Sequence, residues 1–109
     1  MVTPGDVVTV DFPGATGIKR RPAVVVSTEL YHKTRPDVIL GVLTSQLADA
    51  STPSDYVLRD WTNAGLRRPS VFRCFLATLP SASVTKVGHL SSQDWDGVQN
   101  CVKAAISFK

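Results

Sequence analysis

Residues 22–27 read Pro22-Ala23-Val24-Val25-Val26-Ser27, a run in which apolar residues follow one another without alternation. β-branched side chains favour extended backbone, and an unbroken apolar run is typical of a strand covered on both faces. The leading proline has no amide hydrogen, and it biases Arg21 before it towards extended backbone. The run therefore predicts a buried strand that starts, or lies at a sheet edge, at Pro22.

The flanking sequence predicts further short strands on both sides of this run. Val8, Val10 and Phe12 alternate with more polar neighbours, which is typical of a half-buried strand. A turn is expected at residues 13–17, which read Pro-Gly-Ala-Thr-Gly. Gly41 interrupts a later apolar run and indicates a bulge or a close backbone approach. The expected strands are residues 7–12, 22–27, 38–44, 56–58, 70–76 and 84–90.

The last element is the only long helix that the sequence predicts. Ser91 or Ser92 is its expected cap, and Asp94 and Asp96 are expected in its first turn, where the helix dipole favours acids. Apolar residues then recur at helical spacing and predict a face that packs on the core. That face consists of Trp95, Val98, Cys101, Val102, Ala105 and Ile106.

This order of elements predicts a mainly β fold with a C-terminal helix. About five to seven short strands followed by one helix favour a small, strongly bent sheet or barrel with the helix packed on it. With 109 residues, we expect one domain over residues 1–109. No apolar run is long enough to span a bilayer, and the first residues do not resemble a secretory signal. The two cysteines, Cys74 and Cys101, are expected to be reduced thiols in a cytoplasmic protein.

The distribution of charge along the chain is more informative about the binding partner than the net charge of +3. Residues 12–28 hold Lys19, Arg20 and Arg21 and no acid, and residues 61–93 hold four more basic residues and no acid. Two acid-free basic stretches in so small a chain favour one positive face for a polyanion. Scattered, solvated charge remains the alternative on composition alone.

Several kinds of site are excluded by the motifs. Gly14 and Gly17 are not followed by the Lys-Ser/Thr pair of a phosphate-binding loop. His32 and His89 are isolated from any set of residues with metal-ligand spacing. The acids are too scattered to hold the ions of a metal-dependent nuclease, and no Gly-x-Ser-x-Gly nucleophile motif is present.

After these exclusions, the remaining candidate site consists of two segments at the ends of predicted strands. Lys19-Arg20-Arg21 leads into one predicted strand, and Thr44-Ser45-Gln46 leaves another. Neighbouring strand ends can bring such groups together on a rigid scaffold. Arg21 and Thr44 are therefore candidate site residues, the alternative being a surface charge and an ordinary strand-end residue.

In these segments the chain resembles the MazF/PemK toxins. The matching segments are Gly5-Asp6-Val7-Val8-Thr9-Val10-Asp11-Phe12, Arg21-Pro22-Ala23-Val24-Val25-Val26-Ser27 and Leu43-Thr44-Ser45-Gln46. Weaker matches lie at residues 69–79, at residues 87–91 and in the terminal helix. The match runs in order over about residues 4–108.

The resemblance implies an SH3-like barrel that forms a homodimer. It also implies a sequence-selective endoribonuclease that cuts single-stranded RNA with no metal and no other cofactor. The products would carry a 2′,3′-cyclic phosphate and a 5′-hydroxyl, and a cognate antitoxin would restrain the protein. By similarity, Arg21 and Thr44 are the expected catalytic residues. The resemblance assigns no general base here; His32 is a candidate, the alternative being an ordinary loop histidine. The expected RNA-binding residues are Lys19, Arg20, Ser45, Gln46, Arg73 and Lys86. The basic residues among them are expected to line one groove along the dimer, together with Arg21.

Two other functions stay open on this scaffold. One is a non-catalytic toxin that acts on a protein such as DNA gyrase, as CcdB-type proteins do, in which Trp95 and the terminal helix would matter more than Arg21. The other is a barrel that binds nucleic acid without cutting it. The Arg-Pro and Thr-x-Gln pair of motifs favours cleavage.

Overall fold

The computed structural model of the protein describes residues 1–108, except for the side chain at position 49. One six-stranded antiparallel sheet, in the order β4-β5-β3-β2-β1-β6, carries the fold. Its strands are β1 (Asp6–Gly14), β2 (Gly17–Val25), β3 (Asp37–Thr44), β4 (Asp55–Val57), β5 (Val71–Pro80) and β6 (Thr85–His89). The helices are α1 (Glu29–Thr34), α2 (Ser92–Ala105) and two short 3-10 turns, η1 (Leu47–Asp49) and η2 (Ser81–Ser83). The predicted mainly β fold with a C-terminal helix is confirmed.

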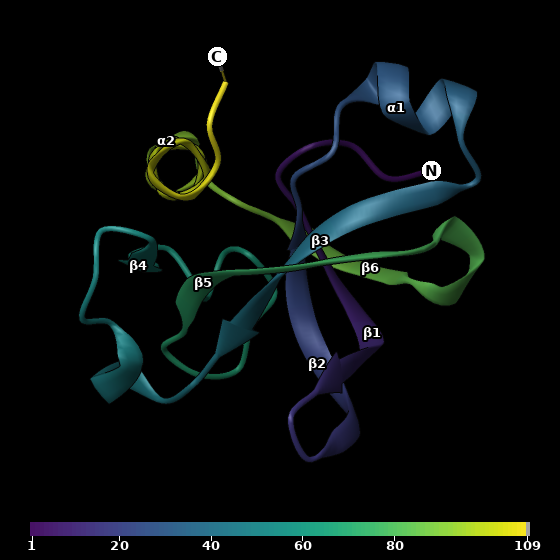
Figure 1. Ribbon diagram of the computed structural model, residues 1–109. Coiled ribbons are helices and arrows are strands. Elements are labelled where there is room, and N and C mark those ends of the chain that lie inside the picture. Colours follow the sequence, from purple (N-terminus) through teal and green to yellow (C-terminus); the bar gives the residue numbers. More distant parts are fainter. Residues whose placement is uncertain (109) are drawn as a thin grey trace.

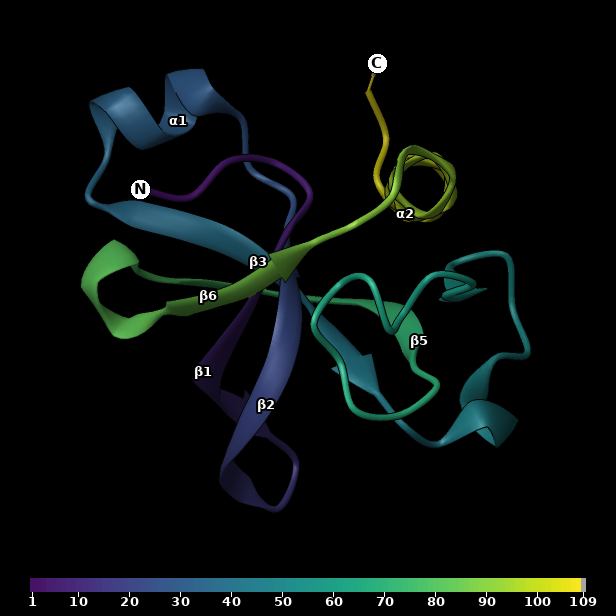
Figure 2. The ribbon, with the colours of Figure 1, turned by 180° about the vertical axis from the view of Figure 1, so that it is seen from behind.

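The sheet is strongly bent and has a hydrophobic cluster on each side. In both ribbon views β1 and β2 run across the direction of β5 and β6 (Figures 1 and 2). The alternation predicted for the first strand divides its side chains between the clusters. The helix-side cluster comprises Val7, Val24, Leu43, Leu58, Ala64, Phe72, Leu90, Val98 and Cys101. The far-side cluster comprises Val8, Val10, Phe12, Ala23, Val25, Val38, Leu40 and Val42.

The second strand is longer than the sequence indicates. It begins at Gly17 instead of Pro22, so the turn expected at residues 13–17 shrinks to Ala15 and Thr16. Pairing with β1 as far as Gly14↔Gly17 holds this early part of β2 extended. The basic residues 19–21 consequently lie on a strand.

Pro22 interrupts the pairing of β2 with β3. The Val26 amide donates to the Ile39 carbonyl at 3.0 Å. Hydrogen-bonded pairs occur at every second position of an antiparallel ladder. Towards the start of β2, the next hydrogen-bonded pairs after Val26 and Ile39 are therefore Val24 with Gly41 and then Pro22 with Leu43. Proline has no amide hydrogen to donate to the Leu43 carbonyl. The pairing ends at Ala23↔Val42, and the strands part beyond it.

Gly41 lies at an irregularity of the sheet, as predicted. The pairing of β3 with β5 shifts register between Gly41 and Leu43. A methyl group at Gly41 would overlap the ring of Phe72, which is fully buried. Glycine therefore lets the aromatic ring fill the core directly against the β3 backbone.

The first turn of α2 fixes a loop as well as the helix. The Ser91 hydroxyl caps the helix by accepting from the Asp94 amide. Asp94 is fully buried, and its carboxylate accepts from the Tyr56 hydroxyl and from the amides of Arg59 and Asp60, at 2.8–3.0 Å. The predicted role of this acid as a dipole partner alone is therefore incomplete. Asp96, expected in the same turn, lies beyond it and is exposed.

Burial sets the state of three further side chains. Burial, with the hydrogen bond to Asp94, raises the pKa of Tyr56 to about 12, so the phenol stays neutral. Cys74 and Cys101 are both free, and burial raises the pKa of Cys101 to about 11. The structure thus has two thiols and no disulfide between them, while their reduced state in the cell stays a prediction. No helix in the described chain is long and apolar enough to cross a membrane.

Replacing Asp94 with alanine should destabilise the fold strongly. The change leaves three partly buried donors without an acceptor, and each such unsatisfied group costs about 1–3 kcal/mol when it is kept from water. We expect the free energy of unfolding in urea to fall by at least about 3 kcal/mol. Asp96→Ala is the matched control, expected to stay within about 0.5 kcal/mol of the parent. Equal stability of the two variants would contradict this role of Asp94.

Candidate functional site

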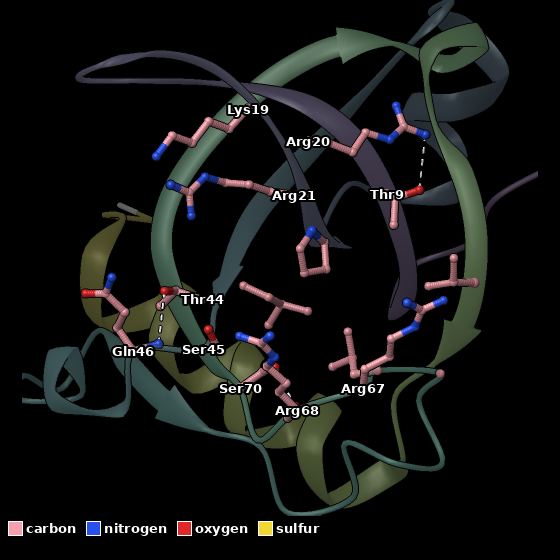
Figure 3. Close-up of a pocket in the computed structure, with 15 residues that line it drawn as sticks. Thr9, Lys19, Arg20, Arg21, Thr44, Ser45, Gln46, Arg67, Arg68 and Ser70 are labelled. Carbon is pink, nitrogen blue, oxygen red and sulfur yellow. Dashed lines mark hydrogen bonds between the residues drawn. The ribbon is translucent and has the colours of Figure 1, made fainter.

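A cleft of about 600 Å³ opens where β2 and β3 part (Figure 3). Arg21 lies one residue before Pro22 on β2, and Thr44 ends β3. Each is two positions beyond the last β2–β3 pair, so the register extended past that pair sets them opposite each other. Arg21 is held from behind by pairing with Val10 on β1, and Thr44 by pairing with Val71 on β5. Two separate pairs of strands thus present these side chains to one cleft.

The charge of the cleft is positive. Its basic lining residues are Lys19, Arg20, Arg21, Arg67 and Arg68. No described lining residue is acidic. Figure 3 shows Lys19 and Arg21 reaching in the same direction, above the segment that carries Thr44 and Gln46. Lysine and arginine side chains on both sides of a cleft suit a polyanion, because each can meet a separate phosphate.

Arg20 points away from its two neighbours, as strand alternation requires. Its Nη2 donates to Thr9 Oγ1 at 3.2 Å, and its Nη1 lies 3.6 Å from a carboxylate oxygen of Asp11. Both members of this ion pair are largely exposed. The charge of Arg20 is thus partly balanced at the rim of the cleft.

The Thr44 hydroxyl is oriented by the backbone that follows it. The Gln46 amide donates to Thr44 Oγ1 at 3.2 Å. A hydroxyl that accepts in this way keeps its own proton available to donate. Thr44 can therefore donate to an oxygen of a ligand in the cleft, while Ser45 and Gln46 add polar groups to the same wall.

Arg67 and Arg68 are the basic lining residues that the sequence analysis did not name as site residues. They follow a tight turn at Gly65, whose φ is +85°, a conformation that favours glycine. A side chain at Gly88 on β6 would overlap the Ala64 carbonyl, so the turn and the strand touch backbone to backbone. The loop is thereby fixed against β6 with Arg67 and Arg68 in the cleft. The pair of arginines after an Asn-Ala-Gly turn was the signal available in the sequence.

Three predicted site residues lie outside the lining of this cleft. Arg73, on β5, lines two neighbouring hollows and has an ion pair with Asp55 at 3.8 Å. His32, on α1, bonds through Nε2 to the hydroxyl of Ser27. Lys86, on β6, lies 3.3 Å from a carboxylate oxygen of Asp6.

Asp6 is fully buried and also accepts a hydrogen bond from His89 Nδ1 at 2.7 Å. Burial acts to raise the pKa of Asp6, but the hydrogen bonds from His89, the Thr3 amide and Lys86 outweigh it and lower the pKa. Asp6 therefore stays ionised and holds Lys86 against β1. Within residues 1–108, the described His, Cys, Asp and Glu side chains form no group of three or more that could hold a metal ion.

The sequence of residues 3–106 matches the family model of the PemK-like, MazF-like toxin of type II toxin–antitoxin systems. The chain belongs to this toxin family. No curated relative matches the sequence.

Solved structures share the fold of this MazF-like chain at low identity. An endoribonuclease in complex with its cognate antitoxin, from a mycobacterial species, is 15% identical with a TM-score of 0.80, covering 100% of this chain and 98% of that chain. The Mycobacterium tuberculosis toxin MazF-mt6 is 17% identical with a TM-score of 0.75, over 92% and 94% of the two chains. A MazE–MazF structure from Deinococcus radiodurans is 17% identical with a TM-score of 0.73, over 99% and 97%.

The positive cleft should make binding of a single-stranded polyanion strongly dependent on salt. For a 2′-O-methyl RNA oligonucleotide, we expect the logarithm of affinity to fall with the logarithm of salt concentration, by about 0.7 for each phosphate contacted. Arg68→Ala should reduce this slope by about 0.7. Arg35→Ala is the control, because Arg35 pairs with Asp37 outside the cleft lining. Fluorescence anisotropy over a salt series measures both, and equal slopes for the two variants would place the RNA elsewhere.

Proposed function

We propose that this MazF-like toxin is an endoribonuclease that cuts single-stranded RNA at selected sequences without a metal ion or other cofactor. The observation that carries the proposal is that Arg21 and Thr44, at the ends of two parting strands, line the same cleft together with a set of basic residues. The single domain acts as a homodimer in the cytoplasm and is restrained by a cognate antitoxin.

The reaction uses the nucleophile that RNA itself carries. The ribose 2′-oxygen attacks the adjacent phosphorus, a new phosphorus–oxygen bond forms, and the bond to the 5′-oxygen of the next nucleotide breaks. The 2′-hydroxyl proton passes to water in the open cleft, and the leaving 5′-oxygen takes a proton from water in the same cleft. The products are a 2′,3′-cyclic phosphate and a 5′-hydroxyl. DNA lacks the 2′-hydroxyl, so it binds without being cut.

Arg21 and Thr44 stabilise the charge that grows on the phosphate oxygens. The guanidinium of Arg21 is permanently charged and can donate two parallel hydrogen bonds to phosphate. Thr44 contributes the hydroxyl proton left available by the Gln46 amide. Donors fixed in advance on two strands reorganise little as the transition state forms, which is the main source of such catalysis. Lys19, Arg67 and Arg68 hold neighbouring phosphates and set the register of the RNA.

The restraint by an antitoxin follows from the same charge. An acidic, disordered segment can fold onto a basic cleft and exclude RNA. Among the structures that share this fold are toxins solved with their antitoxins. The gyrase-directed alternative has less support, because Trp95 is half-buried and packs on the helix-side cluster.

Purified protein should cut a long single-stranded RNA in the presence of EDTA. Positive side chains supply the charge stabilisation in this mechanism, so chelation leaves the rate unchanged. End mapping should find cyclic phosphates and 5′-hydroxyls at a limited set of sequences, and a DNA of the same sequence should stay intact. Activity that disappears in EDTA and returns with magnesium or manganese would contradict the mechanism.

Substitutions of Arg21 and Thr44 should distinguish the catalytic roles of the two residues. Removing one donor to a developing oxyanion lowers kcat about a hundredfold to a thousandfold, so Arg21→Ala should lose activity on that scale while remaining folded. Arg21→Lys should recover little, because the planar fork is lost. Thr44→Val should lose most activity, whereas Thr44→Ser keeps the hydroxyl and much of the rate.

Single-turnover cleavage and circular dichroism measure the two effects. Arg20→Ala is the matched control in the same strand, expected to weaken RNA binding and to leave the cleaved positions unchanged. A Thr44→Val variant with the parent rate would remove Thr44 from the site.

A further inference from the structure

A second, smaller hollow adjoins the cleft and shares its central residues. It has a volume of about 200 Å³, and Arg21, Thr44 and Gln46 line both spaces. Its other walls combine apolar residues, among them Phe12, Val42 and Phe75, with the charged side chain of Arg73. A ligand that contacts Arg21 and Thr44 in the cleft therefore lies directly beside a hollow with an exposed aromatic side chain.

Phe75 is the unusual residue of this hollow. Its side chain is 53% exposed, although β5 buries other aromatic and apolar residues such as Phe72. Strand alternation explains the direction: Phe72 and Cys74 face the helix-side cluster, while Arg73 and Phe75 face outwards. A single exposed phenylalanine is ordinary on a protein surface. Because Phe75 lies in a hollow that shares Arg21 and Thr44 with the cleft, it can contact a ligand bound to those two residues.

The ring of Phe75 is held in place from behind. It packs against the buried ring of Phe12, with the centroids 5.9 Å apart and the planes tilted by 48°. Tilted pairs at this separation are a favourable arrangement for aromatic side chains. A ring fixed on a strand and supported by a core residue loses little further freedom when a ligand stacks on it.

We propose that this hollow binds the base of a nucleotide next to the scissile phosphate, stacked on Phe75. The inference rests on the proposed function and adds to it the element that selects one base. The guanidinium and the hydroxyl at one end of the hollow match the phosphate of a nucleotide. The aromatic face at the other end matches the base of the same nucleotide. Stacking accepts every base, since each has a π face. The amide of Gln46, which can donate and accept, supplies the polar group that distinguishes base edges.

The charge of the site favours a nucleotide over an apolar protein segment. Arg21 lines the hollow itself and has to be met by an anion or by water. A leucine or phenylalanine from a second copy or from an antitoxin would fill the apolar end and leave that guanidinium unpaired. A nucleotide can bind the Arg21 guanidinium through its phosphate and fill the apolar end with its base.

The test compares Phe75 variants on RNAs that lack one base. The substrate is a short RNA containing one mapped cleavage position, and two analogues are abasic on the 5′ or the 3′ side of the cut bond. Phe75→Ala should lower kcat/KM about 5-fold to 150-fold, the range for losing one base–aromatic stack. Phe75→Tyr should keep most of the activity. Phe75→Leu retains apolar volume for folding but should lose the stack. Phe108→Ala is the matched control, an exposed phenylalanine outside this hollow.

The decisive result is the coupling between protein and substrate. One of the two abasic analogues should impair the parent protein by a similar factor, and should impair Phe75→Ala little further, because both changes remove the same stack. Multiplicative losses, or a Phe75→Ala variant as active as the parent, would overturn the base site while leaving RNA cleavage intact. A loss that accompanies a changed oligomeric state in light scattering would reassign Phe75 to a protein contact. A parent protein that cuts no RNA would overturn the proposed function itself.

Discussion

Pro22 has no amide hydrogen, and this single missing donor separates the two central strands of the sheet. At Ala23 and Val24, β2 pairs with both β1 and β3. From Pro22 back to Gly17 it pairs with β1 alone, and Leu43 and Thr44 of β3 pair with β5 alone. The gap between them becomes the cleft. Because each strand remains paired on its other side, Arg21 and Thr44 stay on ordered backbone while facing open space. The interruption lies in the middle of the sheet, where it is costly because it leaves the Leu43 carbonyl without its strand partner.

The rest of the site depends on contacts that fix its far wall. Asp94 binds the amides of Arg59 and Asp60 and so ties the loop that leads to Arg67 and Arg68 to the start of α2. Gly65 and Gly88 then let this loop lie against β6. A helix cap, a buried carboxylate and two glycines thus place two arginines across from Arg21. In the proposed function, this arrangement puts positive charge on both sides of the RNA strand, and the proposed base site sets the ring of Phe75 beside the reacting phosphate.

Local sequence patterns predicted much of the fold, because strands and helices leave local signals. The β-branched run before Ser27, the alternation from Val8 to Phe12 and the cap at Ser91 all have the structures expected of them. The Arg21–Thr44 pair could also be inferred, since both residues flank apolar strands. The roles of Asp94, Arg67 and Arg68 could not, because they depend on contacts between segments some 20 to 35 residues apart. The length of β2 escaped prediction for a similar reason: its first half is extended only because β1 pairs with it.

The most direct measurement is a crystal structure of the protein with a single-stranded RNA carrying a 2′-deoxy nucleotide at the cleaved position, which binds but cannot react. We expect the phosphorus of that linkage to lie in the gap between β2 and β3. Its oxygens should lie about 3 Å from both the Arg21 guanidinium and Thr44 Oγ1, with neighbouring phosphates on Arg67 or Arg68. An RNA bound with its uncleaved linkage on another face, or in contact with neither Arg21 nor Thr44, would contradict the account.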